Sequence, residues 1–420
     1  MFRLAVCATH PIQYQVPIFR ALAKEPGLEL KVFFLSDHSV RGGVDPEFGV
    51  SVKWDVPLLE GYEYEFLAYN GLGLRGKGFF NYSSKDIKEE LKKGRFDGLL
   101  VPGYATRYYV QAIRGAGREG IPVFLRGNNH DGTYARRAVW KQWAREKVLR
   151  ALYNRVEGFF AIGKYMRRHY LEYGVGEEKI FDTPYCVDNE FFQRQRERFE
   201  PQREEIRREL GVRPDTLVLL YSGKLIPKKN PLLMLEAIRS LKDKNRIFLL
   251  VMGEGEMREE FENKAQAILK DTLGMVGFVN QSEMGKYYTA GDVLVLPSSW
   301  GETWGVVVNE AMNFGLPAVV SDAVGCREDL VQEEQTGYVF GRGDAKGLAE
   351  RIERFLEEPE LVAKMGQKAE ELVRHYSVEE NVREMVRAVR ITTEKNINHG
   401  LHGLRGFNRQ LSRCEAVSKK

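Results

Sequence analysis

The chain has 420 residues, of which 43% are hydrophobic and 29% are charged, and its formal net charge is +4. This length predicts two or three domains, and the composition excludes a disordered, collagen-like or fibrous protein. The net charge is too small to indicate a nucleic-acid partner. No stretch of 18 apolar residues occurs, which argues against a transmembrane helix. The first residues, MFRLAVCATHP, are too short for the apolar part of a signal peptide and are typical of a first core strand.

Cysteine usage indicates a reducing compartment. The four cysteines are scattered and form no CxxC pair, so a disulfide framework or a zinc site is not expected. We therefore predict a cytoplasmic protein. The cysteines are Cys7, Cys186, Cys326 and Cys414.

The first half of the chain alternates short apolar segments with helical ones. Such alternation predicts βαβ units around a parallel sheet. It breaks over 45–82, which is rich in glycine and aromatic residues and is interpreted as a β-excursion or an active-site loop. The predicted strands are 3–8, 30–35, 98–102, 122–126 and 158–162, and the predicted helices lie near 15–25, 84–93, 106–119 and 134–153.

A basic stretch over 136–168 contains ten Lys or Arg residues against Glu146 and Glu157. Trp140, Trp143, Leu149 and Tyr153 interleave with them at helical spacing. One interpretation is a solvated helix whose aromatic residues pack inward. The other is a basic amphipathic surface that faces anionic lipid or an anionic acceptor, which would place the protein on the inner face of the plasma membrane.

A second alternating series begins after a charged segment at 191–210. Its predicted strands are 216–223, 246–253, 273–278, 292–297, 317–322 and 337–340, with helices at 231–241 and 305–315. Ser377 to Glu380 matches a capping box that opens a last helix near 378–391. The expected fold class is α/β, with two tandem Rossmann-like domains, a ligand cleft between them and a C-terminal helix that returns to the first domain. The predicted boundaries are 1–190 for the first, acceptor-binding domain, 191–214 for a charged linker, 215–376 for the second, donor-binding domain, 377–395 for the last helix and 396–420 for a basic mobile tail.

The run PSSWGETWGVVVNEAMNFGLP places Glu302 and Glu310 eight positions apart, between a strand and a helix. A helix N-terminus favours a phosphate group, because its free N–H groups and its dipole both attract anions. Two carboxylates beside such a site are suited to accept hydrogen bonds from uncharged hydroxyl groups. Phosphate between two hydroxyl acceptors is the polarity pattern of a nucleotide-sugar.

Other polar motifs follow the strands of the second series in order. Lys224 and Lys229 lie five apart after its first strand, MGEGEM (252–257) follows the second, and VGFVN (276–280) closes the third. Together with the glutamate pair and SDAVGCREDLV (321–331), this series resembles the donor-binding half of the family 4 retaining glycosyltransferases, which have the GT-B fold. The resemblance covers 216–345 closely and the remaining domain plan loosely.

The resemblance implies roles for these residues. Glu302 would contact the donor sugar, Glu310 the ribose, and Lys224 and Lys229 the diphosphate, although the family usually has Arg where Lys224 stands. A lysine there exchanges a bidentate fork for a point charge. Since no Asp-x-Asp occurs in the chain, we expect neither a metal nor any other cofactor. The remaining donor contacts would come from Gly223, Gly253, Phe278, Val279, Thr303, Trp304, Gly305 and Val306.

In the first domain, His10, Gln13 and Tyr14 stand in the loop where family members often have a Gly-Gly pair. Arg126 and the loop after it resemble the place where the family positions a histidine, so His130 is the predicted catalytic residue there. The predicted acceptor side comprises His10, Gln13, Tyr14, Arg126 and Asp131.

The predicted reaction is transfer of a hexose-type sugar, with retention of configuration, from a UDP- or GDP-linked donor to an acceptor hydroxyl. A glycan or lipid-linked acceptor in cell-envelope polysaccharide or lipid-linked glycan synthesis is expected, and no nucleic acid. The alternatives are a nucleotide-sugar epimerase of the same fold and a non-catalytic sugar-binding protein.

Overall fold

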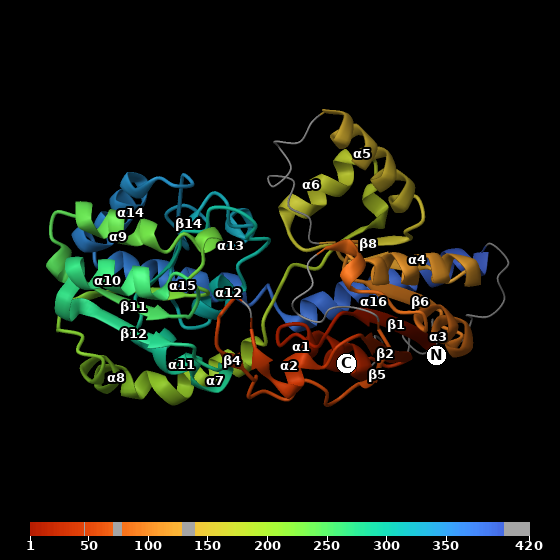
Figure 1. The fold of residues 1–420 in the computed structure, drawn as a ribbon, viewed down its shortest axis with the longest axis horizontal. Coiled ribbons are helices and arrows are strands. Elements are labelled where there is room, and N and C mark those ends of the chain that lie inside the picture. The colour runs from red at the N-terminus through yellow and green to blue at the C-terminus, as the bar shows by residue number, and fades with distance from the viewer. Residues whose placement is uncertain (46, 70–77, 128–138, 399–420) are drawn as a thin grey trace, which may run out of the picture.

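The computed structural model describes residues 1–45, 47–69, 78–127 and 139–398. Two parallel α/β domains lie side by side, and the last helix returns to run across the first (Figure 1). This arrangement confirms the predicted pair of Rossmann-like domains.

The sheet of the first domain has the strand order β5-β2-β1-β6-β7-β8-β9 in the described part of the chain, and every pairing in it is parallel. Helices cover both faces, so strands such as GLLV and GFFA are apolar throughout rather than alternating. The strands are β1 (Phe2–Ala8), β2 (Leu28–Phe34), β5 (Glu63–Phe66), β6 (Gly98–Val101), β7 (Val123–Leu125), β8 (Gly158–Ala161) and β9 (Ile180–Asp182). The helices are α1 (Val16–Lys24), α2 (His38–Arg41), α3 (Ile87–Gly94), α4 (Arg107–Glu119), α5 (Val139–Tyr153) and α6 (Lys164–Glu172).

The segment 45–82 contributes strands to the first domain, in agreement with its interpretation as a β-excursion. Strand β5 joins the edge of the sheet beside β2, and β3 (Gly43–Val44) pairs with β4 (Ser51–Val52) in an antiparallel hairpin. The hairpin belongs to the first domain but extends to the second, and it proves important for the site.

The second domain has the strand order β12-β11-β10-β13-β14-β15, again parallel throughout its described residues. Its strands are β10 (Leu217–Ser222), β11 (Ile247–Met252), β12 (Leu273–Gly277), β13 (Val293–Leu296), β14 (Ala318–Ser321) and β15 (Gly337–Phe340). Its helices are α9 (Leu232–Ser240), α10 (Arg258–Leu269), α11 (Gln281–Ala290), α12 (Val306–Met312), α13 (Arg327–Leu330), α14 (Ala345–Glu357) and α15 (Glu360–Val373).

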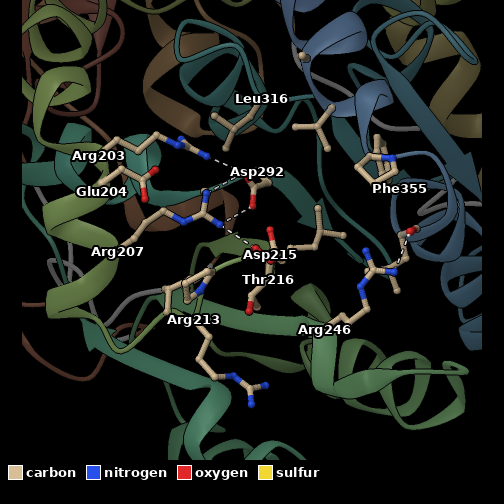
Figure 2. A pocket seen from close by; sticks show the side chains of 18 of the residues that line it. Arg203, Glu204, Arg207, Arg213, Asp215, Thr216, Arg246, Asp292, Leu316 and Phe355 are labelled. Carbon is tan, nitrogen blue, oxygen red and sulfur yellow. Dashed lines mark hydrogen bonds and ion pairs between the residues drawn. The ribbon is translucent and has the colours of Figure 1, made fainter.

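The charged segment between the domains forms two helices, α7 (Asn189–Phe199) and α8 (Arg203–Glu209), which pack on α11. Phe192 is buried against Tyr288, 6.5 Å between ring centroids. Arg203 and Arg207 share the carboxylate of Asp292 at the N-terminal ends of β10 and β13, where they line a cavity of about 1020 Å³ (Figure 2). These bonds fix α8 to the edge of the sheet opposite to the predicted site. The domain boundaries proposed for this segment remain predictions.

Helix α16 (Val378–Asn398) crosses back and packs on α1, β8 and β9 (Figure 1). The backbone N–H of Glu380 donates to Ser377 Oγ at 3.2 Å, as the capping box predicts. Val382 and Met385 are buried in the same cluster as Phe2 of β1. The return of the last helix to the first domain is therefore confirmed. The predicted tail at 396–420 lies, from 399 on, outside the described residues.

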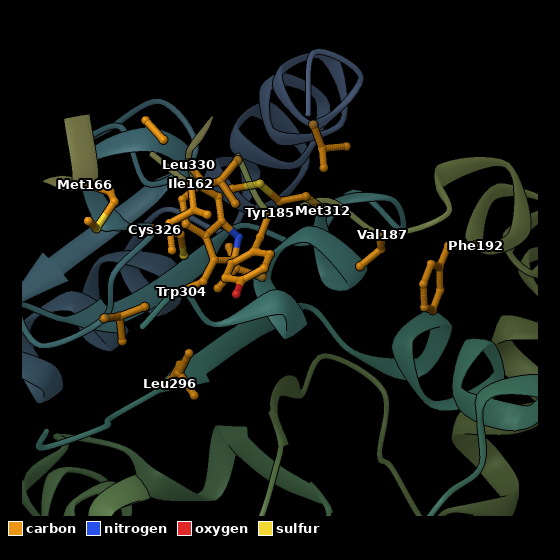
Figure 3. Packing of buried hydrophobic residues seen from close by; sticks show 14 of the residues in the cluster. Ile162, Met166, Tyr185, Val187, Phe192, Leu296, Trp304, Met312, Cys326 and Leu330 are labelled. Atoms are coloured by element: carbon orange, nitrogen blue, oxygen red, sulfur yellow. The ribbon is translucent and has the colours of Figure 1, made fainter. Parts of the chain in front are cut away.

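The two domains also share a buried core (Figure 3). Tyr185, on the segment that follows β9 and leaves the first domain, packs against Trp304 of the second, with 6.2 Å between ring centroids. Ile162 and Met166 of the first domain and Cys326 and Leu330 of the second belong to the same buried cluster. Among the described helices, none combines the length and the apolar character that crossing a bilayer requires.

Candidate active site

A cavity of about 150 Å³ lies at the C-terminal ends of β10, β11 and β12, where the second domain faces the first. This is the edge at which parallel α/β sheets bind ligands. Its lining comes from both domains. The residues predicted for the donor that line it are Gly223, Gly253, Phe278, Val279, Val306 and Glu310.

The floor of this cavity is bare backbone. A Cβ at Gly253 would stand 1.9 Å from the carbonyl oxygen of Gly223, so no other residue fits there without moving a strand end. Gly305, with φ of +96°, turns the chain into α12. Gly253 therefore allows the ends of β10 and β11 to approach closely at the cavity, whereas Gly305 lies outside its lining.

Glu310 lies on α12 and is buried. Tyr288 donates a hydrogen bond of 2.6 Å to its Oε2, and the same hydroxyl lies 3.3 Å from Ser222 Oγ. Burial raises the pKa of Glu310 to about 7, and the bond from Tyr288 only partly opposes this. The carboxyl group is thus held in one orientation at the edge of the cavity, and it titrates near neutral pH.

Glu302 and Lys229 form a part-buried ion pair, and Ser298 Oγ donates to the same carboxylate oxygen at 3.1 Å. Burial alone would raise the pKa of Glu302, but the charge and hydrogen bond of Lys229 outweigh it and the pKa is lowered. Glu302 is therefore ionised at neutral pH. The Lys229 side chain passes next to Gly223, since its Cε would lie 4.0 Å from a Cβ at that position.

Lys224 reaches out of the second domain to the β3–β4 hairpin of the first. Its Nζ lies 2.8 Å from Glu47 Oε2 and 3.2 Å from Asp45 Oδ1, and 4.6 Å from the centre of the Phe48 ring. The lysine predicted to hold a diphosphate is therefore engaged by two carboxylates of this chain. Nothing in the spacing of the motifs indicated these partners.

Thr303 and Trp304 were predicted to contact the donor, and neither of them lines the cavity. The Trp304 side chain is buried and donates through Nε1 to Asn309 Oδ1 at 2.7 Å, and its ring packs between Tyr185 and Tyr376. This ring therefore belongs to the contact between the domains and points away from the donor cavity. A Cβ at Gly325 would stand 1.9 Å from the Thr303 carbonyl oxygen, so the backbone at Thr303 packs directly against the backbone at Gly325.

On the first-domain side, His10 and Gln13 line a second cavity of about 280 Å³ together with His38, Asp45 and Lys224. The rings of His10 and His38 are 4.2 Å apart, and Thr9 Oγ1 lies 3.0 Å from His10 Nδ1. Burial, reinforced by His38, lowers the pKa of His10 to about 3, so the imidazole is neutral. Gln13 also lines the donor cavity, and it therefore stands between the two spaces.

The other first-domain residues have different surroundings. Tyr14 packs edge-on at 5.5 Å against Tyr185. Arg126 is buried and donates to the carbonyl oxygens of Thr183 and Pro184 and to Asn381 Oδ1, at 3.1, 3.3 and 2.9 Å. Its guanidinium thus ties β7 to the interdomain crossing and to α16.

His130 and Asp131, predicted for catalysis and the acceptor, lie outside the described residues, so their roles remain predictions. Within 1–45, 47–69, 78–127 and 139–398, no group of His, Cys, Asp and Glu gathers in a way that could hold a metal ion.

Sequence reasoning missed the residues that the first domain brings to the donor cavity. Phe48 and Trp54 form one wall, and their rings lie 5.3 and 5.9 Å from that of Phe278. Gln281 and Met284 of α11 complete the lining. The aromatic composition of 45–82 was the only signal available, and it indicated a loop without saying where the loop goes.

The arrangement of the two domains around this cavity identifies the fold class of the protein. Two facing parallel α/β domains, with the last helix returning to the first, make a GT-B fold. The family model for glycosyl transferases group 1 matches residues 202–372, so the second domain is similar to that family.

Individual relatives match a similar portion. The putative glycosyltransferase EpsD of Bacillus subtilis is 31% identical over 195 residues, which are 45% of this chain and 50% of EpsD. An uncharacterized glycosyltransferase of Methanocaldococcus jannaschii is 30% identical over 151 residues, 36% of this chain and 38% of the relative. The chain thus matches half or less of these relatives' lengths. Among solved structures, Anabaena Alr3699/HepE in complex with UDP and glucose has a TM-score of 0.68 at 15% identity and covers 93% of this chain and 99% of its own, which supports the fold alone.

Proposed function

We propose that this protein is a retaining glycosyltransferase that moves a hexose-type sugar from a uridine or guanosine diphosphate sugar to an acceptor hydroxyl. The observation that carries the proposal is the convergence of Lys224, Lys229, Glu302 and Glu310 on one strand edge that faces the first domain. Together these groups supply cations for a diphosphate and carboxylates for hydroxyl groups.

The proposed chemistry is electrostatic. In the resting structure each lysine has a carboxylate partner, and an incoming diphosphate would take over Lys224 from the hairpin and share Lys229 with Glu302. Negative charge that develops on the leaving diphosphate is then stabilised by ammonium groups already fixed in place. Glu310 receives the ribose and Glu302 the sugar, and the acceptor approaches from the side of His10. Same-face attack on an oxocarbenium-like centre would retain the anomeric configuration. The lysines take the role of a metal on the diphosphate.

A direct test uses the purified protein with a panel of UDP- and GDP-sugars. Thermal-shift screening identifies the donor, and release of nucleoside diphosphate in the presence of candidate acceptors measures transfer. We expect turnover that persists in excess EDTA and that is lost in Glu310→Ala. Isomerisation of the donor without any acceptor would favour an epimerase, and binding without either reaction would favour a sugar-binding protein. A complete, metal-reversible loss in EDTA would contradict the lysine-based scheme.

We further propose that α5 brings the protein to an anionic membrane surface and a glycan or lipid-linked acceptor, as in cell-envelope polysaccharide or lipid-linked glycan synthesis. Trp143 is 59% exposed and Val148 67% exposed, and Lys147 Nζ lies 3.8 Å above the Trp143 ring. The expectation that the aromatic residues pack inward holds for Tyr153 but is wrong for Trp143. An exposed tryptophan beside a lysine is typical of an interfacial helix.

The proposed surface is smaller than the whole basic stretch. Arg167 pairs with Glu177 and Asp182, and Arg168 pairs with Glu328 of the second domain. These arginines serve the contacts around α6 instead. The surface is therefore limited to the exposed residues of α5.

A further inference from the structure

The β3–β4 hairpin and the residues after it connect the first domain to the mouth of the donor cavity. Besides the contacts of Lys224, Asn280 Nδ2 donates to the Lys53 carbonyl at 2.7 Å, and Ser282 N–H donates to Asp55 Oδ2 at 3.2 Å. Residue 46 lies outside the described residues. The hairpin is thus attached to the second domain on both sides of the cavity, at Lys224 and at the start of α11.

Between these attachments, Phe48 and Trp54 form the aromatic wall of the cavity described above, which is its ceiling opposite the backbone floor. Both stand roughly edge-on to Phe278, at interplanar angles of 76° and 61°. On the opposite side, the floor is the backbone at Gly223 and Gly253. These two backbone segments are already in close contact, so neither can move toward the other to enlarge the cavity. The cavity is therefore bounded on one side by aromatic side chains of the first domain and on the other by closely packed backbone of the second.

The space between ceiling and floor is about 150 Å³. A protein cavity of about this size accommodates one benzene ring. A pyrimidine base is a single six-membered ring, whereas a purine carries a second, fused ring. The purine would have to lift Phe48 and Trp54, and this would break the contacts that hold the hairpin on α11.

We propose that the donor is a pyrimidine nucleoside diphosphate sugar, and that Phe48 and Trp54 of the first domain exclude purines from the base subsite. The inference rests on the proposed function, because it identifies this cavity as the place of the base. It assigns donor selectivity to a segment outside the family-matched residues 202–372. Relatives with a similar second domain could then differ in donor through this hairpin alone.

The test is isothermal titration of the full-length protein with UDP, dTDP, GDP and ADP. We expect the pyrimidine nucleotides to bind at least about 10-fold more tightly than the purine ones. In Trp54→Ala and Phe48→Ala, UDP should bind about 5- to 100-fold more weakly through loss of aromatic contact with the base, while the preference over GDP shrinks or reverses. Trp54→Phe keeps a ring in the wall and should retain most of the selectivity, even if the alanine variant folds poorly.

The matched control is Phe80→Ala, because Phe80 is 73% exposed in the same domain and does not line the cavity. Its nucleotide affinities should equal those of the parent. Binding of GDP as tight as UDP, or an unchanged preference in both alanine variants, would overturn the inference while leaving a nucleotide-binding function intact. Failure of all four nucleotides to bind would overturn the proposed function as well.

Discussion

Removing the Glu47 carboxylate should strengthen donor binding, although Glu47 belongs to the binding cleft. Glu47 Oε2 lies 2.8 Å from Lys224 Nζ, and a diphosphate that uses this lysine must displace it. The hydrogen bond to Lys224 lowers the pKa of Glu47. Burial would raise the pKa of Asp45, but hydrogen bonds from the hairpin backbone and the charge of Lys224 outweigh it, and this pKa is lowered as well. Both carboxylates are therefore ionised at neutral pH, and their hold on Lys224 weakens only as the pH falls through their lowered values.

The size of the effect follows from the exposure of the pair. The Glu47 side chain is 51% exposed and that of Lys224 is 23% exposed, so solvent screens the interaction and it contributes about 0.5–1 kcal/mol. Glu47→Gln should then tighten UDP binding about 2- to 5-fold. Adding Asp45→Asn should increase the gain to about 5- to 20-fold, since Asn retains the oxygen that accepts from the backbone N–H of Glu47 and Phe48.

The assay is isothermal titration with UDP at low and at physiological ionic strength. Glu63→Gln is the matched control, because Glu63 pairs at 3.2 Å with Lys31 and is 55% exposed, yet it lies on β5 away from the cleft. The affinity of the Glu63→Gln variant for UDP should equal that of the parent protein. If Glu47→Gln binds UDP with equal or lower affinity, the carboxylates do not compete with the diphosphate, and the reasoning fails.

Three further outcomes are expected. Lys229→Ala should lower donor turnover about 10- to 100-fold in a nucleoside-diphosphate release assay, through loss of one charge-assisted contact, with circular dichroism showing an intact fold; near-normal turnover would refute its role. The folded-state pKa of Glu310 is raised to about 7, so between pH 4.5 and 7 the folded protein binds a proton that the unfolded chain has released. The contribution of Glu310 to the free energy of unfolding should therefore fall by up to about 3 kcal/mol between pH 4.5 and 7 and stay constant above pH 7. Glu310→Gln should remove this difference in chemical denaturation at several pH values, and parallel pH profiles would contradict it. Trp143→Ser with Lys147→Ser should reduce co-sedimentation with vesicles that contain anionic lipid and leave UDP binding unchanged; equal co-sedimentation would exclude α5 as the membrane surface.

The second domain could be predicted well because its signals are local. Each of its predicted strands is present, and the residues predicted at their ends, such as Gly253 and Phe278, line one cavity. In a parallel sheet the carboxyl ends of strands meet at one edge, so chain order alone brings these residues together. The helix predicted at 305–315 ends at Met312, since a turn of the chain at Gly315, with φ of +70°, leads into β14.

The first domain was predicted less completely because its site depends on long-range contacts. Strand β9, which has only three residues, was missed, and β5, EYEF, an edge strand with exposed residues, was expected only as part of a β-excursion without defined bounds. The meeting of Glu47 with Lys224 spans 177 positions, and no pattern in the sequence encodes it. Trp304 was predicted as a donor contact from its place in the motif. Its side chain instead packs against Tyr185 in the contact between the domains.

The return of α16 to the first domain also bears on how the protein is made. Buried residues of α16, Val382, Met385 and Val389, complete the core around β1, yet α16 follows β9 by about 200 residues. At ribosomal rates of about 5–20 residues per second, the first sheet waits roughly 10–40 seconds for this helix. During that time the second domain is synthesised and can fold ahead of the first. The domain that leaves the ribosome first is thus the last to close its core, and the apolar residues beside α1 stay exposed to chaperones until α16 has been synthesised.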